Sequence, residues 1–339
     1  MKYLSLFSGI GGFELGIGDR AECIGYSEID KYAIQIYQKH FNHKNYGDIT
    51  KIIAKELPDF DLLVGGFPCQ SFSIAGKRLG FKDTRGTLFF DIARIIKEKR
   101  PKYLLLENVK GLLSHDNGRT FRTILSTLNE LGYDIQWQVL NSKNFGVPQN
   151  RERVFIVGHL RGESRPEIFP FREGNKKHIG KTVKQGCCNT LTGKSAGGQN
   201  RRGNYIAKLK EITKGKSDAQ RIYDPEGIAK TLKGEGGGQG AKTGLYAIPV
   251  LSPDRLNKRQ NGRRFKKDGE PSFTLTGQDK HGVYDGMKIR RLTPTECERL
   301  QGFPDRWTEG VSDTQRYKTL GNAVTVNVIE AIINKLLYV

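Results

Sequence analysis

The sequence predicts an α/β fold in which a doubly wound, mainly parallel sheet is joined to a smaller, basic domain of strands and loops. Short apolar runs alternate with segments of helical periodicity through residues 1–160, as is typical of parallel sheets covered on both faces. The alternation stops in residues 161–290, and a helical pattern returns after Leu292. We therefore expect one domain from residues 1–160 and 291–339, and a second from residues 161–290.

The expected strands are apolar runs that end at glycine or polar residues. They cover residues 3–7, 22–27, 62–64, 102–109, 135–140 and 154–157, with a further strand signal that ends at Asp48. The expected helices cover residues 31–41 after the N-cap Asp30, 49–57, 86–99, 119–131 and a strongly apolar final segment, 323–337. Ligands of such sheets bind at the carboxyl ends of the strands.

The middle segment is strongly basic. Residues 161–290 contain 28 Lys and Arg against 13 Asp and Glu, and 21 of the 41 glycines in the chain. Such a segment is either a disordered tail or a surface that follows a polyanion. Thr-Leu runs precede glycine-containing loops at residues 189–199, 229–240 and 273–282. They favour folded strands that present loops to one large ligand, although a simple meander would give the same pattern.

Composition excludes several classes of protein. No uninterrupted apolar run approaches the roughly 18 residues of a membrane helix, and the apolar start is too short and glycine-rich for a signal peptide. The five cysteines are odd in number and have no repeated spacing. This argues against a disulfide framework and for a reducing, cytoplasmic location. Cys187 and Cys188 lack partners at ligand spacing, so we expect free thiols and no metal site.

The first strand runs into the turn FSGIGGFELG, whose Gly9, Gly11 and Gly12 allow the backbone to approach a ligand closely. A tight structural turn is the alternative, because the spacing departs from the dinucleotide pattern. Glu28 ends the second strand, where a carboxylate can accept both hydroxyls of a ribose. Asp48 is placed either to bind an adenine amino group or to cap the following helix. Three such strand ends in a row favour an adenosine ligand.

A cysteine and three charged residues lie at the next strand ends. Cys69 follows the fourth strand in GGFPCQ and reacts only as thiolate, which requires activation by cations or backbone donors. Glu107 ends a buried strand, where burial would raise its pKa and make it a proton donor. Arg151 and Arg153 precede another strand. They are placed to anchor a ligand carbonyl, hold Glu107 or lower the pKa of the thiol, or else to form a solvated basic edge.

The order of these motifs closely resembles one family, the C5-cytosine-specific DNA methyltransferases of bacterial and phage restriction–modification systems. The matching stretches are FSGIGGFELG, YSEIDKYA, GDIT, GGFPCQSFSIAGKRLGFKDTRGTLFF, ENVKGL, NSKNFGVPQNRERVFIVG, LTPTECERLQGFPD and YKTLGNAV. They occur in the order of the family and cover most of residues 1–160 and 290–339. The resemblance implies a Rossmann-like methyltransferase fold, with residues 161–290 as the target-recognition domain.

The resemblance also implies a mechanism and a methyl donor, S-adenosyl-L-methionine, with S-adenosylhomocysteine as product. Cys69 would attack C6 of a cytosine flipped out of the duplex. Glu107 would donate a proton to N3 and Arg153 would bind O2, with Arg151 beside them as a fourth catalytic residue. By the family pattern, the cofactor site would comprise Phe7, Gly9, Ile10, Gly11, Gly12, Glu28, Ile29, Asp48, Ile49, Pro68, Leu88, Asn322 and Ala323.

Double-stranded DNA is the expected partner, bound by a monomer that is paired in function with a restriction endonuclease. Of the three Thr-Leu pairs at 190–191, 231–232 and 274–275, we favour the second as the mark of the specificity loop, because it leads directly into glycines. The loop after Cys69 should be mobile and close over the flipped base. The expected DNA-binding residues are Gln70, Ser73, Lys77, Arg85, Gln199, Arg201, Arg202, Arg221, Thr231, Gly237, Gln239 and Gln278.

Three other functions use part of the same pattern. A tRNA cytosine methyltransferase would share the motifs without needing so large a basic segment. A nicotinamide-dependent oxidoreductase would use the glycine turn but would leave Cys69 and Glu107 unexplained. A non-catalytic DNA-binding protein would use the basic segment alone.

Overall fold

The computed structural model describes residues 1–68, 88–163, 166–171, 222–223, 245–246, 248–253, 263–267, 269–284 and 289–337. The chain divides into two compact units. Unit 1 contains Met1–Ile179, Thr274–Asp279 and Thr293–Val339, and unit 2 contains Gly180–Phe273 and Lys280–Leu292. The short segment Thr274–Asp279 therefore groups with unit 1, although it lies within the sequence range expected for the second domain.

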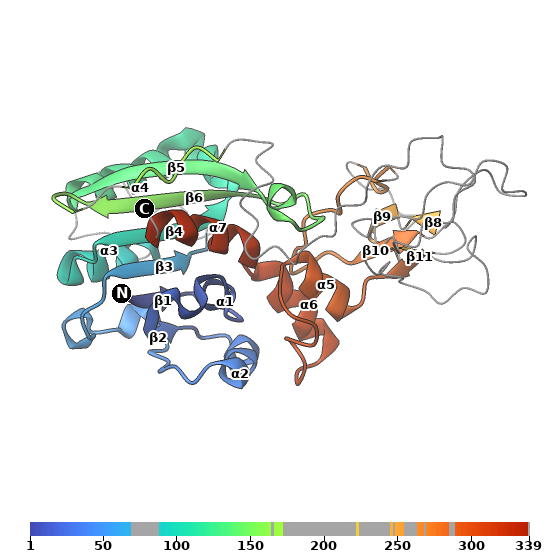
Figure 1. The fold of residues 1–339 in the computed structure, drawn as a ribbon, viewed down its shortest axis with the longest axis horizontal. Helices are drawn as coiled ribbons and strands as arrows, with labels where there is room; N and C mark the ends of the chain where they lie inside the picture. The colour runs from blue at the N-terminus through green and yellow to red at the C-terminus, as the bar shows by residue number, and fades with distance from the viewer. Residues whose placement is uncertain are drawn as a thin grey trace, which may run out of the picture. The chain divides into compact units, whose positions relative to one another are not determined.

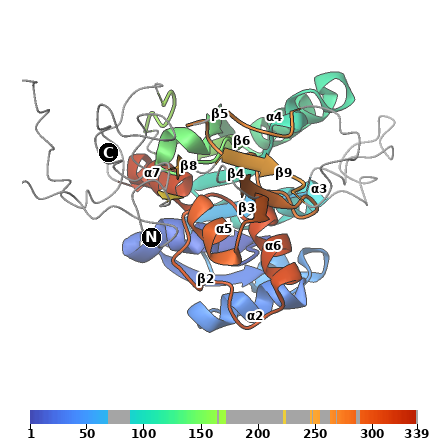
Figure 2. The ribbon, with the colours of Figure 1, turned by 90° about the vertical axis from the view of Figure 1, so that its right-hand side faces the viewer.

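Unit 1 is built on a six-stranded sheet with the strand order β2-β1-β3-β4-β6-β5 (Figures 1 and 2). The first four strands pair in parallel, whereas β6 runs antiparallel to both β4 and β5. The predicted α/β class with a mainly parallel sheet is confirmed. The strands are β1 (Lys2–Leu6), β2 (Glu22–Ser27), β3 (Leu62–Gly66), β4 (Tyr103–Val109), β5 (Tyr133–Asn141) and β6 (Glu152–Leu160).

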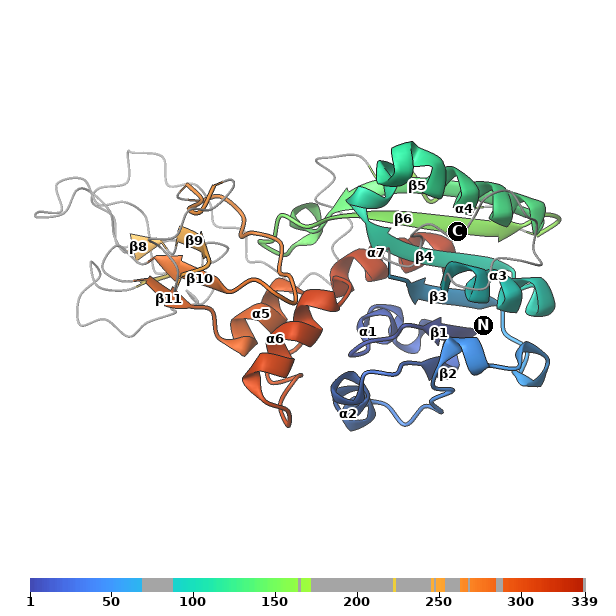
Figure 3. The ribbon, with the colours of Figure 1, turned by 180° about the vertical axis from the view of Figure 1, so that it is seen from behind.

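Helices cover both faces of this sheet, as a doubly wound fold requires. On the face seen in Figure 3, α3 (Leu88–Lys99) and α4 (Arg119–Glu130) pack on one hydrophobic layer. On the other face, α1 (Gly12–Ile17) and α7 (Val326–Leu337) pack on a second layer. Alternate residues of each central strand contribute to the two layers because strand side chains alternate in direction.

The final helix, α7, is held against α1 by close backbone approach. A Cβ atom at Gly16 would lie 2.6 Å from Cβ of Ile329, so only glycine allows the contact. The helical stretch Asp313–Leu337 is long and apolar enough to cross a membrane by composition, but 67% of its most apolar window is buried inside the protein. It is also two helices, α6 (Asp313–Asn322) and α7, so burial in the core explains its apolar character.

The remaining helices of unit 1 begin at well-formed caps. Asp30 accepts hydrogen bonds from the N–H groups of Tyr32 and Ala33 at the start of α2 (Lys31–His40). Thr293 and Glu296 form a capping box at the start of α5 (Pro294–Leu300). Short 3₁₀ turns join the longer elements, namely Gly18–Arg20, Ile49–Lys51, Ala54–Glu56, Lys110–Leu113, His115–Gly118 and Ser142–Phe145.

Two secondary-structure predictions near Asp48 are wrong. The helix expected at residues 49–57 is two separate 3₁₀ turns, and the guanidinium of Arg94 donates to the carbonyl oxygens of Ile49 and Ile52 at 2.9 and 2.6 Å. This side chain thus satisfies carbonyl groups that a continuous helix would use internally. The strand signal that ends at Asp48 corresponds to a single parallel bridge between Tyr26 and Asn45.

Unit 2 contains short strands, as its sequence predicts. Strands β9 (Ile248–Leu251), β10 (His281–Tyr284) and β11 (Ile289–Arg291) form an antiparallel sheet with β10 at its centre. Two two-residue strands, β7 (Ile222–Tyr223) and β8 (Leu245–Tyr246), pair in parallel.

Candidate active site

The carboxyl ends of β1, β2, β3 and β4 meet at one edge of the sheet because these strands are parallel. The reversed direction of β6 brings its beginning to the same edge, where Arg153 pairs in register with Val109 at the end of β4. The predicted residues Glu107 and Arg153, which are 46 positions apart in the chain, are thereby brought together.

Glu107 and Arg153 form an ion pair in which Nε of Arg153 lies 3.0 Å from Oε1 of Glu107, with 15% and 12% of the two side chains exposed. Burial raises the pKa of Glu107, and the charges of Arg153 and Arg151 partly offset that rise. A carboxyl group in this position can hold a proton that a free glutamate would lose, and the guanidinium keeps one of its oxygens oriented.

The side chain of Glu107 extends over the end of β3. A Cβ atom at Gly66 would lie 3.3 Å from Oε2 of Glu107, which is closer than most side-chain contacts. The glycine before Phe67 therefore leaves room for this carboxyl group. The arrangement places a carboxyl group of raised pKa beside the segment that leads into Cys69.

Asn108 ties the ends of β3 and β4 together and was not predicted from the sequence. Its side chain is buried, donates to the carbonyl oxygen of Phe67 at 2.8 Å and accepts from the N–H of Val109 at 2.8 Å. The chain is thus fixed two residues before Cys69. Cys69 lies outside the described residues, as do the predicted DNA contacts Gln70, Ser73, Lys77 and Arg85.

The turn after β1 has the strained backbone that close ligand approach requires. Phe7, Gly9 and Gly11 have φ angles of 55°, 57° and 89°, in the left-handed region that favours glycine. A Cβ at Gly11 would lie 2.5 Å from Cε2 of Phe41, whereas a Cβ at Gly9 would meet no atom within 4 Å. Gly11 is therefore required by packing, and the space beside Gly9 is open.

Glu28 faces this turn from the end of β2. Its Oε2 accepts from the N–H of Gly9 at 2.9 Å, and its Oε1 accepts from the N–H groups of Ile29 and Asp30 at 2.8 Å each. The neighbouring Ile29 side chain is 71% exposed. A carboxylate and an apolar surface at adjacent positions suit a ribose and a purine ring.

Asp48 is a cap in this structure, and its other oxygen has no hydrogen bond among the described residues. Oδ1 accepts from the N–H and the hydroxyl of Thr50 at 3.0 and 2.8 Å, and these bonds lower the pKa of Asp48. Ile49 is buried in the core, Leu88 is partly buried against the same cluster and Pro68 is exposed. Of this group, Pro68 is exposed, and Asp48 and Leu88 are half-buried.

Arg151 is buried in the core, and its predicted catalytic role stays a prediction. It is 2% exposed, and its guanidinium donates to the carbonyl oxygens of Leu275 at 2.7 Å, Gly321 at 3.2 Å and Ala323 at 2.7 Å. Burial and, to a smaller extent, the charge of Arg153 lower its pKa to about 9. From the alternation in Arg151-Glu152-Arg153 we predicted that both arginine side chains lie on one face of a strand. Arg151 precedes β6, however, and its side chain is buried in the core.

Arg151 belongs to a buried polar network that sequence reasoning missed. Gln149 accepts from the N–H of Leu275 at 2.8 Å and donates to the carbonyl oxygen of Leu300 at 2.8 Å. Gln301 donates to the carbonyl oxygen of Leu320 at 2.8 Å and accepts from the hydroxyl of Thr325 at 2.9 Å. The network holds the α6–α7 connection in place.

The predicted cofactor residues Asn322 and Ala323 lie in that connection. Asn322 ends α6 with its side chain exposed, and its Oδ1 lies 3.2 Å from where a Cβ at Gly277 would be. Ala323 is buried and uses its carbonyl oxygen to accept from Arg151. The turn after β1 meets the same region, because a Cβ at Gly12 would lie 2.8 Å from Cγ1 of Val324.

Of the twelve predicted DNA-binding residues, the structure describes only Gln278, whose side chain is exposed. The Thr-Leu pair at 274–275 is anchored in unit 1, since the hydroxyl of Thr274 donates to the carbonyl oxygen of Asn150 at 2.5 Å. The favoured pair, Thr231-Leu232, lies outside the described residues, as do Gln199, Arg201, Arg202, Arg221, Gly237 and Gln239.

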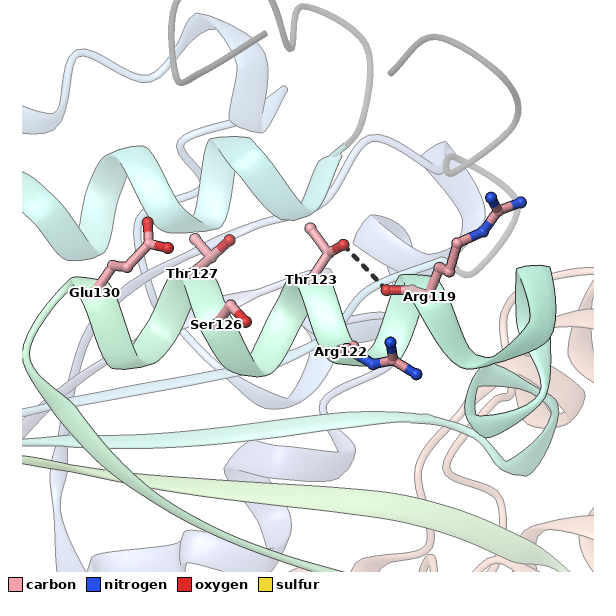
Figure 4. A pocket seen from close by; sticks show the side chains of 6 residues that line it. All are labelled: Arg119, Arg122, Thr123, Ser126, Thr127 and Glu130. Atoms are coloured by element: carbon pink, nitrogen blue, oxygen red, sulfur yellow. Dashed lines mark hydrogen bonds between the residues drawn. The ribbon is translucent and has the colours of Figure 1, made fainter. Parts of the chain in front are cut away.

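A surface groove follows α4 (Figure 4). It is lined by none of the residues predicted for catalysis or cofactor binding. Its lining residues are Arg119, Arg122, Thr123, Ser126, Thr127 and Glu130.

Comparison with known proteins places this geometry in context. The profile of the family described as C-5 cytosine-specific DNA methylase matches residues 1–338. The orphan methyltransferase M.SPRI of Bacillus phage SPR is 38% identical over 100% of this chain and 98% of its own length. The type II methyltransferase M.HhaI of Haemophilus parahaemolyticus is 36% identical over 98% and 93%. The crystal structure of the S. pombe Dnmt2 methyltransferase shares the fold, with a TM-score of 0.58, 19% identity and coverage of 99% and 98%.

Proposed function

Because the chain belongs to the C-5 cytosine-specific DNA methylases, we propose that Glu107 and Arg153 of this chain act together on a cytosine that Cys69 attacks. The family transfers a methyl group to C5 of cytosine in DNA. The observation that carries the assignment of residues is the buried ion pair at the end of β4, beside the strand that leads into Cys69.

Reaction at C5 of cytosine would use a nucleophile, a proton donor and a hydrogen-bond donor to O2, and the chain has a residue for each. The Cys69 thiolate would add to C6 and form a carbon–sulfur bond, which moves electrons into the ring and makes C5 nucleophilic. Glu107, with its raised pKa, would give a proton to N3 as negative charge develops there. Arg153 would hold O2 of the base through the N–H groups that Glu107 leaves free. Once C5 carries the methyl group, loss of its proton to a base would break the carbon–sulfur bond at C6 and release the Cys69 thiolate, while N3 returns its proton to Glu107.

The turn after β1 and the end of β2 would hold S-adenosylmethionine. The open space at Gly9, the carboxylate of Glu28 and the exposed Ile29 side chain suit an adenosine group. Pro68 and Asn322 are exposed and Asp48 is half-buried, so they would complete the site. When bound, the cofactor supplies the electrophilic methyl group. The part of the chain described here contributes binding and orientation at these positions.

Unit 2 and the segment after Cys69 would bind double-stranded DNA. The basic surplus of residues 161–290 suits the phosphate backbone, and arginine and glutamine side chains suit base edges. The cytosine must leave the duplex before the thiolate can reach C6. We propose that the resulting methylation protects DNA against a restriction endonuclease with the same target site.

Methyl transfer from labelled S-adenosylmethionine to duplex DNA and to tRNA tests the proposal. We expect label in DNA only, and bisulfite sequencing should place it at cytosines within one short sequence. Cys69→Ser should abolish transfer while specific DNA binding remains. Label confined to tRNA, or a Cys69→Ser variant of normal rate, would contradict the proposed function.

A further inference from the structure

The turn of residues 7–12 is bound by a side chain that lies 297 positions after Ile10 in the chain. The indole N–H of Trp307 donates to the carbonyl oxygen of Ile10 at 2.9 Å, and only 7% of Trp307 and 1% of Ile10 are exposed. The proposed mechanism gives Trp307 no role. Because a buried carbonyl group that loses its donor is costly, this contact favours one conformation of the turn.

The contact with Trp307 fixes the peptide unit between Ile10 and Gly11. The carbonyl oxygen of this unit accepts from the indole, and its N–H donates to the carbonyl oxygen of Ser8 at 3.1 Å. The φ angle of Gly11 is 89°, but glycine adopts several other backbone conformations at low cost. The two hydrogen bonds therefore select the observed orientation of the peptide.

Trp307 itself is held in place by other rings. His40, the last residue of α2, stacks on the indole with ring centroids 3.6 Å apart and an angle of 7° between the planes, and its Nε2 lies 2.7 Å from the carbonyl oxygen of Trp307. The ring centroids of Phe41 and Phe303 lie 5.8 and 5.5 Å from that of Trp307. Phe41 also packs against Gly11 of the turn. The indole is therefore held in one orientation, with its N–H directed at the turn.

The backbone that carries Trp307 is built around a buried carboxylate. Glu298 of α5 is completely buried and accepts from the N–H groups of Arg306 at 2.7 Å and Thr308 at 2.9 Å. These two residues precede and follow Trp307. The guanidinium of Arg316 in α6 lies 3.1 Å from the same carboxylate, so its charge is compensated. The chain is thus fixed on both sides of Trp307, as a residue that orients another segment requires.

We propose that Trp307 is a positioning residue for cofactor binding, whose indole N–H holds the turn of residues 7–12 in the conformation that receives S-adenosylmethionine. This inference rests on the proposed function, because it assumes that the turn binds the cofactor. Without the indole donor, the peptide after Ile10 populates other orientations, and the apparent affinity falls with the fraction of molecules that remain competent. Saturating cofactor selects the competent turn, so the rate of methyl transfer at saturation is kept.

Calorimetric titration with S-adenosylhomocysteine and initial rates of methyl transfer to duplex DNA test the inference. Trp307→Phe keeps an aromatic ring at the stack with His40 but has no N–H. The affinity for S-adenosylhomocysteine should fall about five- to tenfold. KM for S-adenosylmethionine should rise by the same factor, while kcat stays within about twofold of the wild type.

The other tryptophan of the chain offers a matched control. Trp137 lies in β5 and is 44% exposed. Trp137→Phe is the same chemical change as Trp307→Phe, and it should leave the affinity and both kinetic constants unchanged. An equal loss of affinity in Trp137→Phe would overturn the role of Trp307.

A second control separates positioning from stability. Leu128→Ala in α4 removes buried apolar volume from the hydrophobic layer on the face of the sheet opposite to α1. It should lower the thermal stability at least as much as Trp307→Phe but leave the affinity for S-adenosylhomocysteine unchanged. If Leu128→Ala weakens binding as much as Trp307→Phe does, Trp307 contributes only to stability and the inference is wrong.

Proton exchange at the two indole N–H groups tests the contact without the Trp307→Phe variant, should that variant fail to fold. Trp137→Phe assigns the two indole signals in an NMR spectrum of isotope-labelled protein. If opening of the contact with Ile10 excludes the ligand, S-adenosylhomocysteine at ten times its Kd should slow exchange at Trp307 by up to about tenfold. Exchange at Trp137 should stay the same. An unchanged exchange rate at Trp307 would overturn the inference.

The outcomes distinguish the inference from the proposed function. A Trp307→Phe variant that binds S-adenosylhomocysteine with wild-type affinity, or that loses kcat while KM stays the same, would overturn the role of Trp307 and leave the cofactor site intact. Absence of S-adenosylhomocysteine binding by the wild type would instead overturn the cofactor site itself.

Discussion

Two acidic side chains lie at the same edge of the sheet and are held by different kinds of partner. Glu28, at the end of β2, accepts three backbone N–H groups, and one of them comes from the glycine turn after β1. Glu107, at the end of β4, is buried against the guanidinium of Arg153 from the antiparallel strand β6. Main-chain N–H groups therefore hold Glu28, whereas one guanidinium group holds Glu107 in a largely buried position.

The difference indicates what each acid can do. Backbone donors fix the oxygens of Glu28 as acceptors, which suits the binding of hydroxyl groups. Burial raises the pKa of Glu107 while only one of its oxygens is paired, which suits proton transfer. Under the proposed function, β1 and β2 would supply the binding half of the edge, whereas β4 and the reversed strand β6 would supply the acid and the charge of the chemical half.

Loss of the proton that Glu107 carries should have the largest effect on the rate of methyl transfer. In Glu107→Gln the shape is kept but no proton can be given to the base, so the rate of methyl transfer should fall by about 10²- to 10⁴-fold. The affinity for S-adenosylhomocysteine should stay the same, because Glu28 and the turn are untouched. Labelled methyl transfer and calorimetry measure the two effects. A variant that loses cofactor affinity as much as rate would break the division of the edge into two halves.

The sequence was sufficient to predict this edge because its residues follow local patterns. Glu107 ends an apolar run, and Arg153 begins another, so their meeting required only the strand order. The fate of Arg151 was not predictable, because its acceptors are main-chain carbonyls at residues 275, 321 and 323. No side-chain pattern marks such acceptors. The clamp by Asn108 was missed for the same reason, since it binds the carbonyl oxygen of Phe67.

The buried network beside the chemical half should contribute mainly to stability. Arg151→Met leaves the buried carbonyl oxygens of Leu275 and Gly321 without their side-chain donor and removes one of the two donors to Ala323, so the free energy of unfolding should fall by about 3 kcal/mol or more. The matched change Arg153→Met removes one largely buried ion pair whose acid can take up a proton, so it should cost about 1–2 kcal/mol while it lowers the rate of methyl transfer more. Urea unfolding of both variants measures the comparison. Equal losses of stability would mean that Arg153 is as structural as Arg151.

The smallest expected effect concerns Glu28, in the binding half of the edge. Glu28→Gln keeps the size of the side chain but turns one acceptor into an NH₂ group, which must then face the N–H of Gly9 or those of Ile29 and Asp30. Loss of about 1–1.5 kcal/mol of hydrogen bonding should weaken S-adenosylhomocysteine binding about tenfold, with little change in the rate of methyl transfer at saturating cofactor. Titration calorimetry and initial rates separate the two effects. A reduced saturated rate with unchanged affinity would place Glu28 in the chemistry, and would show that backbone donors do not confine an acid at this edge to binding.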